Sequence, residues 1–117
     1  MRHKRKIRKF GRNLSYRKSL LRNLVISFFQ NKRIVTTEAK AKQLRSIAEK
    51  LITVGKNQDL ASVRKINSYL NHPATTRKVV EIGQKLKDRK GGYTRIIKAN
   101  CRRGDASKMA IIQIVEQ

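Results

Sequence analysis

The sequence predicts a two-layer α/β (α+β) domain with a basic extension at its N-terminus. Three observations support this fold class. Apolar residues recur at helical spacing in four segments between residues 15 and 86, and strand-like runs occur at 33–37 and twice after residue 92. The first 14 residues are rich in bases and offer no face for burial. Because 117 residues make one domain at most, we expect a basic extension, 1–14, and a single α/β domain, 15–117.

The positive charge is concentrated near the N-terminus. Residues 1–37 carry 12 Lys or Arg and no acid, whereas the remaining 80 residues hold 18 bases and all seven acids. A chain with a net charge of +23 repels itself unless a polyanion neutralises it. Nucleic acid offers phosphates at a matching density, and a lipid surface is the weaker candidate because the bases do not alternate with a sustained apolar face.

The extension is expected to be disordered in the free protein and to fold against RNA or DNA as its charge is neutralised. The alternatives are a solvated leader or an import signal. Its bases are Arg2, Lys4, Arg5, Lys6, Arg8, Lys9 and Arg12.

The first helix is expected to begin near Ser15, a plausible N-cap, and to run for about four turns. Arg17, Lys18 and Arg22 lie towards its flank and opposite side. The apolar stripe could fill a groove on a partner, but a place in the core is favoured. The stripe consists of Leu20, Leu21, Leu24, Val25, Phe28 and Phe29.

A short strand at 33–37 comes next, because four of its five residues are β-branched. Thr37 can then cap a second helix, 38–54, which Gly55 would stop. We expect two pairs at i,i+4 spacing to support this helix, namely Glu38–Lys42 and Arg45–Glu49.

Two further helices follow. Asp59 is expected to cap the third, which carries Leu60, Val63, Ile66 and Leu70 and ends near Asn71. Pro73 suits the start of the fourth, whose apolar residues are Val79, Val80, Ile82 and Leu86. Gly83 inside this helix costs stability unless another backbone lies close to it.

The pattern changes to strands after Gly91 and Gly92. Residues 93–99 and 109–115 are strand-like, and the polar loop 100–107 joins them as an antiparallel hairpin. With 33–37 as third strand, we expect a small three-stranded mixed sheet packed on helices. The predicted order is therefore helix, strand, three helices, two strands.

No group of residues predicts catalysis. His3 and His72 have no metal-ligand spacing, and Cys101 stands in a loop where a small residue near a strand end is the better interpretation. The carboxylates are scattered, which argues against a two-metal nuclease. We expect no enzyme, no metal and no cofactor.

Localisation and partner follow from what the composition excludes. No apolar run reaches the roughly 18 residues that span a bilayer, and no secretory signal is visible. A single cysteine fits a reducing compartment, so a cytosolic protein is expected. Composition does not separate RNA from DNA, but a flexible basic arm suits the crevices of a large folded RNA better than a uniform duplex. The alternative is a nucleoid-type DNA-coating protein.

Four blocks of sequence carry a resemblance to a known family. They are MRH, SYRKSLLRNL, IVTTEAKAKQLRSIAEKLIT and GGYTRIIKANCRRGDASKMAIIQIVE. In this order, over nearly the whole chain, they resemble the bacterial large-subunit ribosomal protein seventeen family. The resemblance implies a structural protein of the cytoplasmic ribosome that binds 23S rRNA on the solvent side, near the polypeptide exit tunnel. It also implies neighbouring large-subunit proteins as partners; we expect no membrane contact and no homo-oligomer.

The resemblance also implies RNA-contacting residues. They are Arg2, His3, Lys4, Arg12, Arg17, Arg22, Gly91, Gly92, Tyr93, Arg95, Lys98, Arg102 and Arg103. The charge of the extension adds Arg5, Lys6, Arg8 and Lys9. Independently of the resemblance, arginines can grip phosphate with two bonds and glycines let a backbone approach RNA closely.

Overall fold

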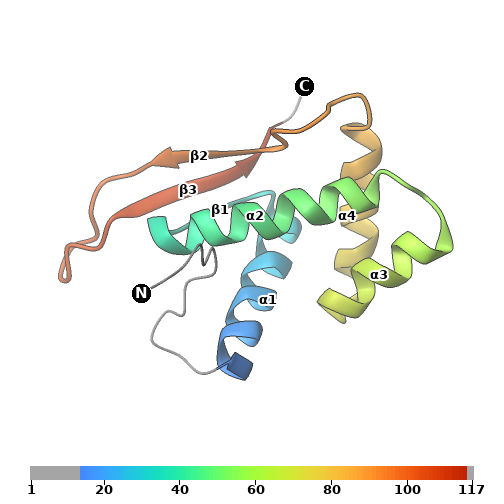
Figure 1. Ribbon diagram of the computed structural model, residues 1–117. Helices are drawn as coiled ribbons and strands as arrows, with labels where there is room; N and C mark the ends of the chain where they lie inside the picture. The colour runs from blue at the N-terminus through green and yellow to red at the C-terminus, as the bar shows by residue number, and fades with distance from the viewer. Residues whose placement is uncertain (1–13, 116–117) are drawn as a thin grey trace, which may run out of the picture.

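The fold is a three-stranded sheet with helices on one of its faces, as a computed structural model shows (Figure 1). The structure describes residues 14–115. The elements are α1 (Leu14–Asn31), β1 (Arg33–Thr37), α2 (Glu38–Gly55), α3 (Leu60–Leu70), α4 (Pro73–Lys85), β2 (Thr94–Lys98) and β3 (Met109–Ile114). The predicted fold class and element order are confirmed.

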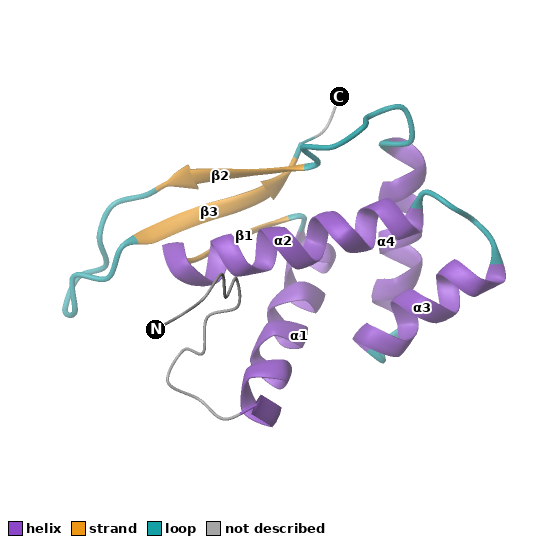
Figure 2. Cartoon of the chain, in the orientation of Figure 1, coloured by secondary structure: helices purple, strands orange, loops and turns teal. Residues whose placement is uncertain are grey.

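The sheet has the order β1-β3-β2, and both of its pairings are antiparallel. The expectation of a mixed sheet was therefore wrong, whereas the antiparallel hairpin and the third strand at 33–37 are confirmed. The chain enters β1 directly from α1 and returns to the sheet only after three more helices. This path lets β1 run antiparallel to β3, the central strand (Figure 2).

Helix α2 lies between the sheet and the other helices. It contacts all three strands on one side and α1, α3 and α4 on the other (Figure 1). The buried core joins these layers through Phe28 and Phe29 of α1, Leu44 and Ile52 of α2, and Ile112 of β3. Burying such side chains contributes roughly 2 kcal/mol each, which is how a chain of modest apolar content holds a defined body.

Most caps were predicted correctly. The Thr37 hydroxyl accepts from the amide of Lys40 at 3.4 Å, and the Asp59 carboxylate accepts from the amide of Ser62 at 3.1 Å. Hydrogen bonding with the Ser62 side chain and then with its amide lowers the pKa of Asp59. Ser15 was assigned wrongly, because it lies inside α1, which begins at Leu14. His72 supplies a cap that was not predicted, since its Nδ1 accepts from the amide of Thr75 at 3.3 Å.

Some apolar positions differ from the predicted stripes. On α1 the buried residues are Leu21, Val25, Phe28 and Phe29, while Leu20 and Leu24 are half-buried. Leu60 is 62% exposed, because the first residue of α3 lies beyond the core. Helical spacing gives the direction of a side chain, but it does not show where the neighbouring element ends.

Gly55 and Gly83 mark the crossing of α2 and α4. A Cβ built on Gly83 would lie 2.5 Å from the carbonyl carbon of Gly55 and 2.8 Å from the amide nitrogen of Lys56. The close backbone that the sequence required for Gly83 is therefore present. Gly55 is the last residue of α2 and not the residue after it; a Cβ there would lie 3.0 Å from the Val79 carbonyl oxygen.

Glu49 of α2 holds the start of β2. Its carboxylate accepts from the amide of Tyr93 at 3.2 Å, from the amide of Thr94 at 3.0 Å and from the Thr94 hydroxyl at 2.8 Å. The predicted Glu38–Lys42 pair is present at 3.2 Å. The predicted Arg45–Glu49 pair is absent from the part of the chain that the structure describes, because Glu49 reaches β2 instead.

We expect Glu49→Gln to lower the free energy of unfolding by about 2 kcal/mol, because hydrogen bonds to a charged acceptor are worth about 1.5–3 kcal/mol. The amide group of glutamine would also place a donor against a backbone N–H. Urea unfolding followed by circular dichroism measures the change. Glu81→Gln is the matched control, since Glu81 is exposed on α4 and has no polar partner among residues 14–115. Equal losses in the two variants would contradict the assigned role.

Candidate nucleic-acid interface

Eight of the predicted RNA-contacting residues lie outside the described part of the chain. They are Arg2, His3, Lys4, Arg5, Lys6, Arg8, Lys9 and Arg12. Their contribution therefore stays a prediction from the sequence. The remaining nine lie on α1, in the loop before β2, on β2 and in the hairpin loop.

The two arginines of α1 are half-buried. Arg22 Nε donates to the carbonyl of Tyr69 at 3.1 Å, which ties α1 to the end of α3. Burial raises the pKa of Tyr69, and the Arg22 charge opposes that shift. The Nε of Arg17 is buried and finds no hydrogen-bond partner among the described residues. Arg22 therefore has a structural role besides any contact with nucleic acid.

The loop before β2 contains one residue whose ring is buried. Tyr93 is 2% exposed, and the Lys56 ammonium lies 4.6 Å from the centroid of its ring. Lys56 Nζ also donates to the carbonyl of Arg89. Tyr93 belongs to the core, and its predicted contact with RNA stays a prediction from the sequence. The sequence could not reveal this burial, because the contact joins the residue before β2 to the residue after α2.

The two glycines before Tyr93 differ from each other. Both are exposed, and a Cβ on either one would meet nothing within 4 Å. Gly92 has a φ of 64°, a conformation that favours glycine, and it turns the chain into β2. Gly91 has neither a positive φ nor a close neighbour, so the fold itself does not require glycine there.

The sheet face opposite α2 carries a pair of arginines, one of which the sequence analysis missed. Arg33 of β1 and Arg95 of β2 both pair with Gln113 of β3, so their side chains leave the sheet on one face. Both arginines are exposed, and together with Lys32 they line a hollow of about 350 Å³. Only the strand register brings Arg33 beside Arg95, which is why spacing along the chain gave no signal for it.

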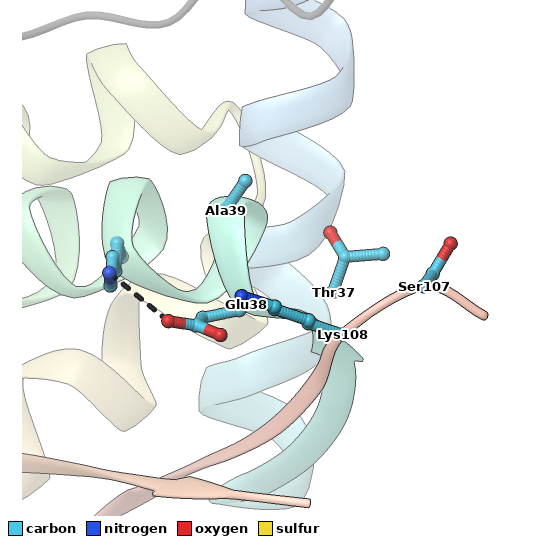
Figure 3. Close-up of a pocket in the computed structure, with 6 residues that line it drawn as sticks. Thr37, Glu38, Ala39, Ser107 and Lys108 are labelled. Atoms are coloured by element: carbon cyan, nitrogen blue, oxygen red, sulfur yellow. Dashed lines mark ion pairs between the residues drawn. The ribbon is translucent and has the colours of Figure 1, made fainter. Parts of the chain in front are cut away.

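A second hollow of about 470 Å³ lies where α2 begins, at the base of the hairpin (Figure 3). It is lined by Thr37, Glu38, Ala39, Lys42, Ser107 and Lys108. The hydrogen bond from Lys42 lowers the pKa of Glu38, with smaller contributions from Lys98 and Lys108. Because Lys42 is already paired with Glu38 and the carboxylate would repel a second anion, this hollow is a poor phosphate site.

The hairpin loop between β2 and β3 extends beyond the helices (Figure 1). Arg102 and Asp105 form two hydrogen bonds, Nε to Oδ1 at 3.2 Å and Nη2 to Oδ2 at 2.5 Å. This contact lowers the pKa of Asp105 and raises that of Arg102. Arg103 is exposed and has no hydrogen bond or ion pair with the described residues.

Residues 14–115 contain no group of His, Cys, Asp or Glu that could hold a metal ion. Within the same range, no helix is long and apolar enough to cross a membrane. Cations lie on α1, on the open sheet face and on the hairpin loop. The fold and this surface define a class: small, strongly basic α+β proteins.

Comparisons with known proteins identify the family. The family model for ribosomal protein L17 matches residues 20–115. The large ribosomal subunit protein bL17 of Nautilia profundicola is 52% identical over 120 residues, which cover 98% of each chain. Its counterpart in Desulfotalea psychrophila is 51% identical over 116 residues, covering 98% of this chain and 90% of the relative. The chain therefore belongs to the ribosomal protein L17 family, which confirms the resemblance read from the sequence. It is accordingly a structural protein of the cytoplasmic ribosome and not an enzyme.

Proposed function

We propose that this protein is a structural constituent of the large ribosomal subunit that binds 23S rRNA. The observation that carries the proposal is the match, over nearly the whole chain, to relatives named as large-subunit proteins. The charge supports it: 12 bases and no acid in residues 1–37 require a polyanion of high charge density.

Binding is proposed to divide between the body and the extension. The compact body docks by shape, and the extension neutralises phosphates between RNA helices. In the described residues the contacts are proposed to fall on α1, on the loop before β2, on β2 and on the hairpin tip, with Arg33 added by the sheet register. Arginine suits this role because its planar fork matches phosphate oxygens.

Competition between nucleic acids tests this function. We expect 23S rRNA to displace duplex DNA from the protein at physiological salt, because a body that docks by shape discriminates between folded RNA and a uniform duplex. Fluorescence anisotropy with labelled competitors measures the preference. Equal affinity for the two would favour the alternative, a nucleoid-type protein that coats DNA.

The position in the subunit is proposed to be on the solvent side near the polypeptide exit tunnel, beside other large-subunit proteins. Cys101 offers a direct test, because it is the single cysteine of the chain and is exposed in the hairpin loop. A photo-crosslinker attached to Cys101 should capture exit-region rRNA or proteins in reconstituted subunits. Crosslinks confined to the subunit interface side would contradict this position but not the assignment to the large subunit.

A further inference from the structure

The tip of the hairpin, residues 102–107, has its shape set by hydrogen bonds within the protein. The Arg102 amide donates to the carbonyl of Ser107 at 2.9 Å, and the Ala106 amide donates to the carbonyl of Arg102 at 3.0 Å. Asp105 Oδ1 accepts from the amide of Ser107 at 3.1 Å. Gly104 and Ala106 take positive φ values of 102° and 57° to close the turn. The tip is therefore organised before any ligand binds.

Within this tip the guanidinium of Arg102 is already occupied. Its Nε and Nη2 meet the two carboxylate oxygens of Asp105, a two-point contact of the kind that a phosphate would make with an arginine. A phosphate could take that edge only by displacing Asp105 and leaving its carboxylate beside another anion. Exposed ion pairs are weak, but here the acceptor also holds the Ser107 amide, so displacement would disturb the turn.

The next residue has no such partner. Arg103 is exposed, and no described residue satisfies its guanidinium, so its full set of donors faces solvent. The charges of Arg102 and Asp105 cancel, and the net cation of the tip is Arg103.

We propose that Arg103, and not Arg102, is the hairpin-tip arginine that contacts RNA phosphate, and that Arg102 is a positioning residue that shapes the tip through Asp105. The assignment rests on the proposed binding of rRNA. It divides two adjacent arginines that the sequence treats alike, and it makes Asp105 a part of the interface that orders the tip without touching RNA.

Two double variants of equal net charge test the division. R102Q/D105N removes the internal pair, and its asparagine oxygen can still accept from the Ser107 amide. R103Q/E81Q removes the free arginine together with the exposed Glu81 of α4, and it leaves the Arg102–Asp105 pair intact. Binding of the full chain to 23S rRNA transcript is measured across a salt series.

We expect R102Q/D105N to bind within about threefold of the wild type with an unchanged salt slope. R103Q/E81Q should bind about tenfold more weakly, with a slope reduced by roughly 0.7–0.9, the value for one lost phosphate contact. Equal binding by the two variants, or the reverse order, would overturn the proposal. If the wild type itself showed no salt-dependent binding, the proposed function would fail instead.

A measurement on the wild-type chain removes any dependence on how the variants fold. Phenylglyoxal modifies accessible arginines, and mass spectrometry can report the two positions separately. We expect bound RNA to protect Arg103 several-fold and to leave Arg102 weakly reactive with or without RNA. Protection of Arg102 alone would refute the division of roles.

Discussion

Replacing Gly83 by alanine is expected to lower the free energy of unfolding by about 3 kcal/mol, although alanine is the better helix former by about 1 kcal/mol. The added Cβ would lie 2.5 Å, 2.7 Å and 2.8 Å from the carbonyl carbon and oxygen of Gly55 and the amide nitrogen of Lys56. All three are backbone atoms, so no side chain can rotate away. Helices α2 and α4 would have to separate, which loosens the layer that supports the sheet.

Urea unfolding at fixed salt measures the loss in free energy of unfolding. In thermal unfolding, a domain of this size should lose about 15 °C in melting temperature. Gly91→Ala is the matched control, because a Cβ at Gly91 would meet nothing within 4 Å and its φ is not positive. We expect Gly91→Ala to leave stability within about 0.5 kcal/mol of the wild type. A Gly83→Ala variant as stable as this control would show that the two helices can shift without cost.

Gly83 also illustrates what could be predicted from the sequence. Local signals were sufficient for several ends of elements, because a cap or a turn depends on a few neighbouring residues: Thr37 and Asp59 cap their helices as expected, and β1 occupies the predicted residues. A glycine in a helical pattern indicated a cost in stability unless another backbone lay close, but not which backbone that would be. The identity of Gly55 as the neighbour depends on the packing of α2 against α4.

Other features that the sequence did not reveal depend on contacts between residues distant in sequence. Glu49 had a suitable helical partner in Arg45, yet its carboxylate reaches Tyr93 and Thr94, 44 and 45 residues away. Tyr93 was named among the RNA-contacting residues, and only the packing of the helices against the sheet shows that it is buried. The direction of β1 in the sheet likewise depends on the path of the three helices between it and β2.

For the candidate interface, too, the sequence indicated some features and could not show others. The net charge indicated that the interface binds a polyanion, since no fold can neutralise 30 bases with seven acids. Spacing could not rank individual cations, because the sequence shows neither the Arg102–Asp105 pair nor the contact of Arg22 with Tyr69. The structure thus separates arginines that stabilise the body from arginines that remain available to an external anion.

Deleting residues 2–13 is expected to leave the body folded and to weaken binding to 23S rRNA by on the order of a thousandfold at physiological salt. The deletion removes seven bases and no acid, and it ends immediately before α1, so every described element is retained. If about five of these bases contact phosphate, the slope of log affinity against log salt should fall by roughly four. Filter binding across a salt series measures both changes, and circular dichroism checks the fold.

A second variant separates charge from sequence in the extension. Reversing the order of residues 2–13 keeps all seven bases and moves five of the seven basic positions relative to α1, because Lys6 and Lys9 only exchange places. We expect this variant to retain most of the salt slope, because counterion release depends on the number of phosphates neutralised. Its affinity should still fall about tenfold, because an extension that threads between RNA helices must place its cations in register with them. Wild-type affinity and slope in the deleted chain would show that the body alone binds rRNA, and the extension would then need another role.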